Sequence, residues 1–133
     1  MTLVREAMVP EPPALEGSAS AQDAAELLSR DEVRAVFVID GGRLIGVVTR
    51  KTLVREIVAQ GRDPRGTHLA SIAEDPWLPV DGETDLVEAF HLLEEHDLER
   101  VPVTENGRLV GVLSRAIVQR RIAEDETPPD EEG

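Results

Sequence analysis

The 133-residue chain has no cysteine, few aromatic residues (2%) and a shortage of basic residues. Without cysteine, disulfide scaffolds, thiol catalysis and cysteine-ligated zinc are excluded. Acidic residues outnumber basic ones by 27 to 14, and the net charge of −13 argues against nucleic acid and anionic membranes as partners. The apolar runs at 35–39 and 44–48 are far too short to span a bilayer, and the N-terminus carries charges where a signal peptide needs apolar residues. We therefore expect a soluble, cytoplasmic protein.

An internal repeat organises the chain. A shift of 65 residues aligns Thr2–Ala59 with Thr67–Glu124 without a gap, and 15 of the 58 pairs are identical. Two copies are too few for a solenoid, so we expect a pseudo-symmetric pair packed face to face. Repeat 1 is placed at 1–60 and repeat 2 at 61–125. Residues 126–133 form an acidic segment without apolar anchors, which predicts a disordered tail.

Each half predicts the same order of elements. Ser20 is typical of a helix N-cap before apolar residues at helical spacing, and an equivalent helix follows Thr84. A strand, a glycine-containing turn and a second strand predict a hairpin at 35–48 and again at 100–113. Thr49 and Ser114 end these hairpins and are expected to cap helices at 50–60 and 115–124. Further short strands are expected at 10–15 and 76–80, which makes the fold mixed α/β.

This order of elements, present twice, resembles the tandem cystathionine-β-synthase (CBS) domain. The resemblance covers Thr2 to about Glu124, almost the whole chain. It implies an α/β (α+β) fold in which two pseudo-symmetric repeats, each a small sheet with flanking helices, pack as a disk. The motifs that carry it are a short opening helix at Val4–Met8, the paired strands Val36-Phe-Val38 and Val101-Pro-Val103, and the strand ends Gly46-Val-Val-Thr49 and Gly111-Val-Leu-Ser114.

The resemblance also implies a type of function. In such pairs, two clefts between the repeats are the sites for adenosine-containing ligands such as AMP, ADP, ATP or S-adenosylmethionine. Two pairs commonly associate as a dimer, and most members regulate an attached enzyme, channel or transporter. No such domain accompanies the pair here, so we expect a stand-alone CBS pair that acts on an unidentified client protein and has no catalytic residues of its own.

The strand-to-helix junctions are the candidate ligand sites. A helix start offers free N–H groups and a positive dipole end, which suit an anion. Thr49 and Ser114 place a hydroxyl there, and Arg50, Lys51 and Arg115 add positive charge in the first helical turn. We expect Thr49 and Thr52 to face a sugar. Arg50 and Lys51 are expected to face phosphates. The alternative, which the sequence leaves equally open, is that the hydroxyls are only N-caps and the cations only solvated surface.

Two positions depart from the family pattern. Ligand-binding members typically carry an aspartate three residues after the Thr/Ser, where it accepts hydrogen bonds from the ribose hydroxyls. Those positions are Thr52 and Ile117 here. Ile117 has no acceptor, and a threonine makes weaker hydrogen bonds than a carboxylate. We therefore expect at most one nucleotide per chain, at the cleft that contains Thr52, and expect the substitution Thr52→Asp to strengthen binding.

Other candidate residues carry weaker patterns. Arg100 precedes the Val-Pro-Val strand and is expected to reach a phosphate, with a surface salt bridge to Glu99 or Glu105 as the alternative. Trp77 is either a cleft wall or a plug over the apolar core. His91 and Glu95 have helical i,i+4 spacing that suits a metal, but such pairs are more often surface contacts, so no metal site is predicted.

Three function classes follow from these residues. The first is a ligand-sensing regulatory module. The second is a degenerate pair that serves as a dimeric protein-interaction scaffold, which the changes at Thr52 and Ile117 favour. The third, a small hydrolase or metalloprotein, rests only on His91 and scattered hydroxyls. A homodimer is expected because the helices after Thr49 and Ser114 carry seven aliphatic residues: Leu53, Val54, Ile57, Val58, Ile117, Val118 and Ile122.

Overall fold

The computed structural model describes residues 1–126 and forms two compact units. One, which we call the repeat-1 unit, contains Glu11–Trp77 and Asn106–Leu109. The other, the repeat-2 unit, contains Met1–Pro10, Leu78–Glu105 and the chain from Val110 onward. Of the tail predicted at 126–133, only Glu126 lies within the described residues, where it ends a helix.

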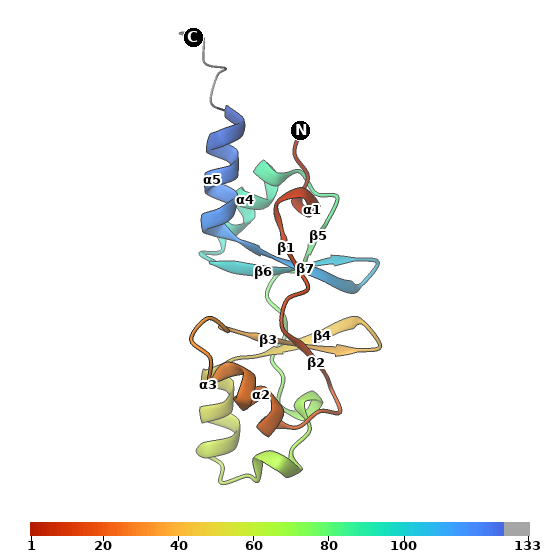
Figure 1. The fold of residues 1–133 in the computed structure, drawn as a ribbon, viewed down its shortest axis with the longest axis vertical. Coiled ribbons are helices and arrows are strands. Elements are labelled where there is room, and N and C mark those ends of the chain that lie inside the picture. The colour runs from red at the N-terminus through yellow and green to blue at the C-terminus, as the bar shows by residue number, and fades with distance from the viewer. Residues whose placement is uncertain (127–133) are drawn as a thin grey trace. The chain divides into compact units, whose positions relative to one another are not determined.

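The repeat-1 unit has a small mixed sheet with its helices on one side (Figure 1). Strand β2 runs parallel to β3, and β3 pairs with the antiparallel strand β4. A π-helical segment continues the short helix that follows β4. The elements are β2 (Ala14–Glu16), α2 (Ala21–Leu28), β3 (Val36–Asp40), β4 (Arg43–Val48), α3 (Arg50–Leu53), the π-helical segment (Val54–Val58) and two 3₁₀ turns (Pro64–Gly66 and Leu69–Ser71).

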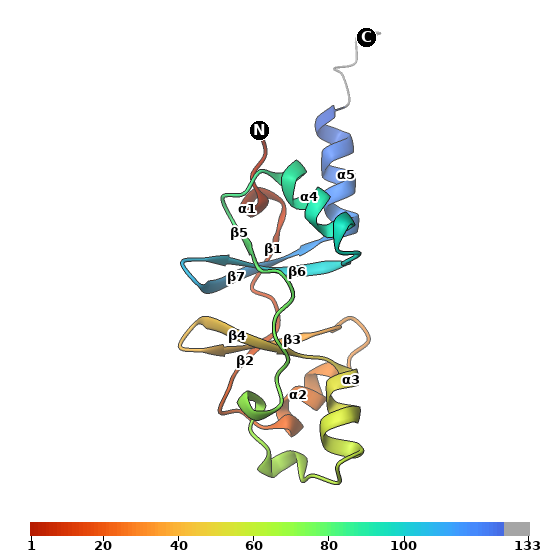
Figure 2. The same cartoon turned by 180° about the vertical axis from the view of Figure 1, so that it is seen from behind.

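The repeat-2 unit repeats this plan with a longer final helix. Strand β5 runs parallel to β6, β6 neighbours β7, and β1 pairs with β7 in the antiparallel sense. Helices α4 and α5 lie side by side on one side of these strands, as Figure 2 shows from behind. The elements are α1 (Val4–Ala7), β1 (Val9–Pro10), β5 (Val80–Asp81), α4 (Leu86–Glu95), β6 (Arg100–Glu105), β7 (Arg108–Ser114) and α5 (Arg115–Glu126). The first two residues of β7 belong to the repeat-1 unit.

The opening segment of each repeat belongs to the unit of the other repeat. Residues 1–10 lie in the repeat-2 unit, where Val9 pairs with Val112 of β7. Residues 67–77 lie in the repeat-1 unit, where Glu74 pairs with Val47 of β4. The two pairings are equivalent under the 65-residue shift. The hairpin of each repeat therefore pairs with the opening segment of the other repeat: β4 pairs with Glu74, and β7 pairs with Val9.

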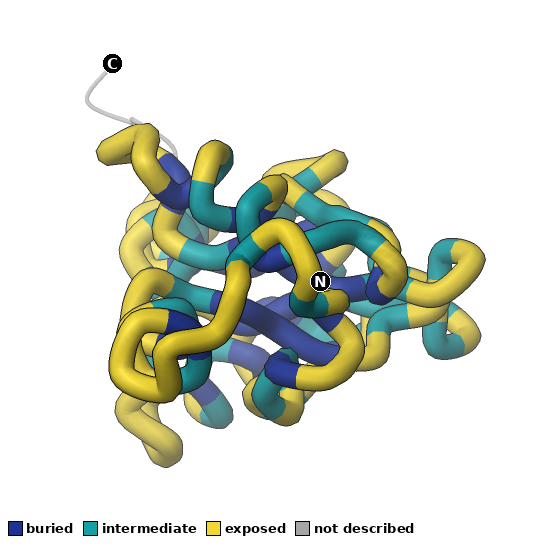
Figure 3. The backbone as a smooth tube through the Cα atoms, turned by 90° about the horizontal axis from the view of Figure 1, so that it is seen from below, coloured by how far each residue is buried: buried dark blue, intermediate teal, exposed yellow. Residues whose placement is uncertain are grey.

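Each unit has its own apolar core, and Figure 3 marks the buried stretches of the backbone in dark blue. Buried valines of the hairpin strands pack against buried leucines and alanines of the helices, as expected for amphipathic elements. The repeat-1 core comprises Ala21, Ala24, Leu28, Val33, Val36, Val38, Val48, Ile57, Leu69 and Ile72. The repeat-2 core comprises Val4, Val80, Leu86, Ala89, Leu93, Val101, Val103, Leu113 and Val118.

The predicted helices and hairpins are confirmed, and so is the mixed α/β class. Ser20 caps α2 as expected: its hydroxyl accepts from the Asp23 N–H at 3.1 Å, and the Asp23 carboxylate accepts from the Ser20 N–H at 3.1 Å. At the equivalent helix the N-cap is Asp85, one residue later than the sequence predicted. Among the described residues, no helix is long and apolar enough to cross a membrane.

The short strands differ in their bounds from the prediction. The strand expected at 76–80 is confined to Val80–Asp81, and the one expected at 10–15 is split into Val9–Pro10 and Ala14–Glu16. Pro76 and Pro79 cannot donate to a strand ladder, and Leu78 between them has a positive φ of 42°, so pairing cannot extend through this stretch.

Candidate functional site

The repeat-1 junction is where β4 ends and α3 begins. Thr49 has an extended backbone and is the N-cap of α3, as predicted. The Thr49 N–H donates to the Thr52 hydroxyl at 3.0 Å, and the Thr52 N–H donates to the Thr49 hydroxyl at 3.4 Å. This reciprocal pair satisfies backbone donors that the start of a helix otherwise leaves free. The structure thus brings Thr49 and Thr52 together.

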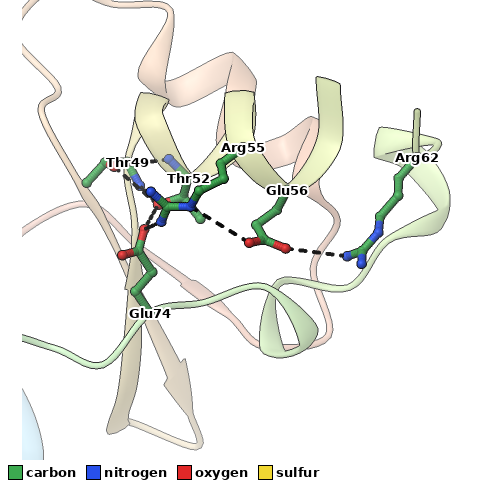
Figure 4. Close-up of polar contacts among 6 residues, drawn as sticks. All are labelled: Thr49, Thr52, Arg55, Glu56, Arg62 and Glu74. Atoms are coloured by element: carbon green, nitrogen blue, oxygen red, sulfur yellow. Dashed lines mark hydrogen bonds and ion pairs between the residues drawn. The ribbon is translucent and has the colours of Figure 1, made fainter. Parts of the chain in front are cut away.

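A carboxylate from outside repeat 1 completes the junction. The Thr52 side chain is fully buried, and its hydroxyl donates to Glu74 Oε2 at 2.5 Å. The same Glu74 oxygen lies 2.8 Å from Nη2 of Arg55, on the π-helical segment. Figure 4 shows that Thr52 and Arg55 project from the helix and that Glu74 reaches them from a separate segment of the chain.

The backbone fixes Glu74 at this place. Its N–H donates to the Val47 carbonyl and its carbonyl accepts from the Val47 N–H, both at 2.9 Å. Gly46 allows this close approach: a Cβ built on it would lie 2.7 Å from the Ala73 Cβ and 3.0 Å from the Glu74 carbonyl oxygen. Glu74 is therefore positioned by strand pairing, with its side chain 36% exposed.

Two longer ion pairs extend this cluster along the helix. Arg55 Nε lies 3.9 Å from Glu56 Oε2, and Arg62 Nη1 lies 3.9 Å from Glu56 Oε1 (Figure 4). All of these side chains are about one-third exposed or more, and exposed pairs at such distances stabilise proteins only weakly. The contacts of Glu74 to Thr52 and Arg55 are therefore the short, well-formed interactions of this cluster.

The two cations predicted to face phosphates have different surroundings. The Arg50 guanidinium donates to three carbonyls at and just after the C-terminal end of α2: Leu28 at 2.8 Å, Arg30 at 2.8 Å and Val33 at 3.0 Å. It holds the chain that follows α2, as cations near helix C-termini do. Lys51, the only lysine of the chain, is exposed and makes no hydrogen bond or ion pair with a described side chain.

The repeat-2 junction has the same backbone but different polarity. The Ile117 N–H donates to the Ser114 hydroxyl at 3.5 Å, so Ser114 occupies the N-cap position as predicted. Ile117 is half-buried and offers no acceptor. Arg115 Nη1 lies 3.4 Å from Asp97 and 3.8 Å from Glu99, so its charge is partly neutralised. A shallow cavity of about 220 Å³ adjoins Ile117 in this unit.

Arg100 and Trp77 lie outside both junction networks. The Arg100 side chain is exposed and makes no ion pair among residues 1–126, so the salt bridge to Glu99 or Glu105 considered from the sequence does not form. Trp77 is 44% exposed and belongs to neither core cluster, which contradicts a role as a plug over the core. Within the described residues, no group of three or more metal-ligating side chains is gathered at one place.

Sequence reasoning missed Glu74 and Arg55. The sequence places Glu74 in the opening segment of repeat 2, opposite Val9 of repeat 1, and nothing local assigns it to the repeat-1 junction. The available signal was the small residue at Gly46, because a glycine inside a strand often marks the close approach of another backbone.

Comparison with known proteins gives consistent matches. The CBS domain family model matches the chain twice, over residues 4–59 and 69–124. Hypoxic response protein 1 of Mycobacterium tuberculosis is 31% identical over 102 residues, which cover 76% of this chain and 71% of that protein. A crystal structure of Hypoxic Response Protein I with two coordinated zinc ions superposes with a TM-score of 0.78 at 28% identity, covering 91% of this chain and 99% of that one. The crystal structure of CBSX2 in complex with AMP superposes with a TM-score of 0.76 at 28% identity, covering 96% and 100%.

Proposed function

The chain belongs to the CBS-domain family as a tandem pair of CBS repeats, and from that premise we propose that it is a regulatory module that senses an adenine nucleotide. The observation that carries this proposal is the AMP complex of CBSX2, a protein similar to this chain over nearly the whole length of both. The ligand classes proposed are AMP, ADP, ATP and S-adenosylmethionine, with binding at the repeat-1 junction. A regulatory module needs a ligand that binds one arrangement of the protein better than another.

We assign the phosphate contact to Lys51 rather than to Arg50. Lys51 lies in the first turn of α3, and its ammonium group has no partner among residues 1–126, whereas the Arg50 guanidinium already donates to three carbonyls. Moving Arg50 to a ligand would leave those carbonyls without a partner, which costs about 1–3 kcal/mol where they are buried. The roles of Arg100, Ser114 and Arg115 toward the ligand stay predictions.

Nucleotide binding is expected to stabilise the folded protein. A nucleotide present at a hundred times its dissociation constant adds about 2.7 kcal/mol to the free energy of unfolding if it binds only the folded state. A thermal-shift panel of AMP, ADP, ATP, GTP, S-adenosylmethionine and NAD, with and without magnesium, measures this effect. Inorganic phosphate at equal ionic strength is the control ligand.

Two variants test whether the thermal shift arises from binding at the repeat-1 junction. Lys51→Gln is expected to reduce the shift, while Arg65→Gln, which removes an exposed cation elsewhere in the same unit, leaves it unchanged. Equal loss in both variants would mean that only the general charge of the unit matters. If no nucleotide shifts the unfolding temperature at millimolar concentration, the nucleotide-sensing proposal fails.

That outcome would favour the second candidate function, a protein-interaction scaffold. Two observations support it: Arg50 is engaged in the fold, and the second junction carries Ile117 in place of a polar acceptor. The thermal-shift panel therefore distinguishes the two candidates directly.

We also propose that the module is a homodimer. Most of the seven aliphatic residues expected at the interface are buried or half-buried within their own units, so the face is narrower than predicted. Val54 and Val58 remain 58% and 73% exposed, one helical turn apart on the π-helical segment. Their equivalents on α5 are Gln119 and Ala123, so only repeat 1 presents this apolar pair.

Val54→Asp is expected to weaken self-association tenfold or more, because the burial of one valine contributes about 1.5 kcal/mol or more. Gln119→Asp, the same change at the equivalent position of repeat 2, is the matched control and should have little effect. Light scattering at tens of micromolar gives the mass. Monomer mass for the unmodified protein, or equal weakening by both variants, would contradict this interface.

A further inference from the structure

We propose that Glu74 is the specificity-determining residue of the repeat-1 junction, where its carboxylate accepts hydrogen bonds from the neutral donors of the bound nucleotide. This inference rests on the proposed function and names the part of the ligand that the site recognises. The donors in question are the ribose hydroxyls and the exocyclic amino group of adenine, which present the same chemistry to a carboxylate.

The first argument is that neighbouring residues hold the Glu74 carboxylate in place through one of its two oxygens. Oε2 accepts from the Thr52 hydroxyl at 2.5 Å and pairs with Arg55 at 2.8 Å. Oε1 makes no hydrogen bond or ion pair with a described residue, and the side chain is 36% exposed. The backbone on which it stands is paired with Val47 by two hydrogen bonds. A carboxylate oriented by its neighbours, with one oxygen unpaired among residues 1–126 and a partly exposed side chain, is preorganised to accept from a ligand.

The second argument concerns which groups such an oxygen selects. An ionised carboxylate accepts hydrogen bonds and donates none, and it repels the phosphates of a nucleotide. It can therefore bind only the part of the ligand that carries neutral donors. Lys51, exposed and unpaired among the described side chains, suits the phosphates. The two charges of opposite sign thus fix the direction in which a nucleotide lies at this junction.

The third argument comes from the other repeat, which lacks the acceptor. The 65-residue shift places Val9 opposite Glu74, Ile117 opposite Thr52 and Arg120 opposite Arg55. The repeat-2 junction therefore keeps the arginine but has neither the carboxylate nor the hydroxyl that orients it. A ligand selected through its neutral donors has a partner at one junction only, so one nucleotide is expected per chain.

Calorimetric titration of the full chain with nucleotide analogues tests the assignment. Glu74→Gln keeps the size of the side chain and removes the charge, and it is expected to weaken AMP binding about tenfold to a hundredfold, as for the loss of a hydrogen bond to a charged group. Asp75→Asn, which removes the neighbouring exposed carboxylate, is the matched control and should stay within about twofold of the unmodified protein. Glu74→Asp, which keeps the charge but shortens its reach, gives a second variant if Glu74→Gln does not fold.

The analogues identify the donor. They are 2′-deoxy-AMP and 3′-deoxy-AMP, which lack one ribose hydroxyl, and inosine monophosphate, which lacks the amino group. For the analogue without the recognised donor, the penalty of Glu74→Gln should fall to within about twofold, because removing both partners of one interaction costs no more than removing either. Loss of the penalty with a deoxy analogue assigns the ribose, and loss with inosine monophosphate assigns the base.

The contrary outcomes are distinct. An equal penalty for every ligand, or tighter AMP binding by Glu74→Gln, means that Glu74 acts only through its charge or through the fold, and the inference fails while nucleotide sensing stands. Absence of binding by the unmodified protein overturns nucleotide sensing, and this inference with it.

Discussion

The substitution Gly46→Ala is expected to lower the free energy of unfolding by about 2 kcal/mol, within the range measured for overpacked positions. The added Cβ would lie 2.7 Å from the Ala73 Cβ and 3.0 Å from the Glu74 carbonyl oxygen. Neither neighbour is the end of a flexible side chain, so the backbone of the opening segment has to move. That movement strains the two hydrogen bonds between Glu74 and Val47.

Urea-induced unfolding measures the change, and Gly66→Ala is the matched control. A Cβ on Gly66 would approach only the side chain of Asp63, at 3.3 Å, in an exposed turn, so its effect should stay within about 0.5 kcal/mol. Gly46→Ala should also weaken nucleotide binding, because Glu74 moves with its backbone. Equal free energies of unfolding for the two variants would show that the segment carrying Ala73 and Glu74 can shift without loss of stability.

The sequence was sufficient for those elements whose signals are local. The N-cap at Ser20, the hairpin turns and the apolar spacing of the helices each depend on residues a few positions apart, and the duplication repeats each signal. The motif around Thr49 likewise identified the junction. Gly42 and Gly107 have positive φ values of 93° and 80°, as the predicted turns require.

The contacts that the sequence did not predict are long-range. Glu74 lies 22 residues after Thr52, and its pairing with β4 depends on how two distant segments meet. The role of Arg50 was missed for the same reason: its guanidinium donates to carbonyls 17 to 22 residues earlier in the chain. No helical or strand periodicity records such pairings, so the sequence does not distinguish a side chain that satisfies distant backbone groups from one that is unpaired.

These long-range contacts reverse one expectation drawn from the sequence, that Thr52→Asp strengthens nucleotide binding. Thr52 is fully buried, and its hydroxyl already donates to Glu74. An aspartate at position 52 has no hydroxyl to donate to Glu74. Its carboxylate would also place a second negative charge next to that of Glu74. In place of an acceptor at position 52, we propose that Glu74 accepts the hydrogen bond of the ligand.

Thr52→Asp is therefore expected to lower the free energy of unfolding by about 3 kcal/mol, as for a buried charge without a partner, and to weaken nucleotide binding. Thr52→Val removes the hydroxyl without adding charge and should cost only about 1 kcal/mol. Chemical denaturation gives both values, and their difference gives the combined cost of burying the new charge and of its repulsion by Glu74.

The double variant Thr52→Asp with Glu74→Gln provides the decisive comparison. If repulsion between the carboxylates causes the loss, removing the second charge should restore most of it, because the amide introduced at position 74 can donate to the new carboxylate and Arg55 stays nearby. The two substitutions would then be strongly non-additive, as expected for residues in direct contact. Additive losses would show that burial of the aspartate, and not its neighbour, destabilises the fold. Should Thr52→Asp instead match Thr52→Val in stability and bind AMP more tightly, the contact between Thr52 and Glu74 would not govern this junction, and the acceptor at position 52 would be the one that recognises the ligand.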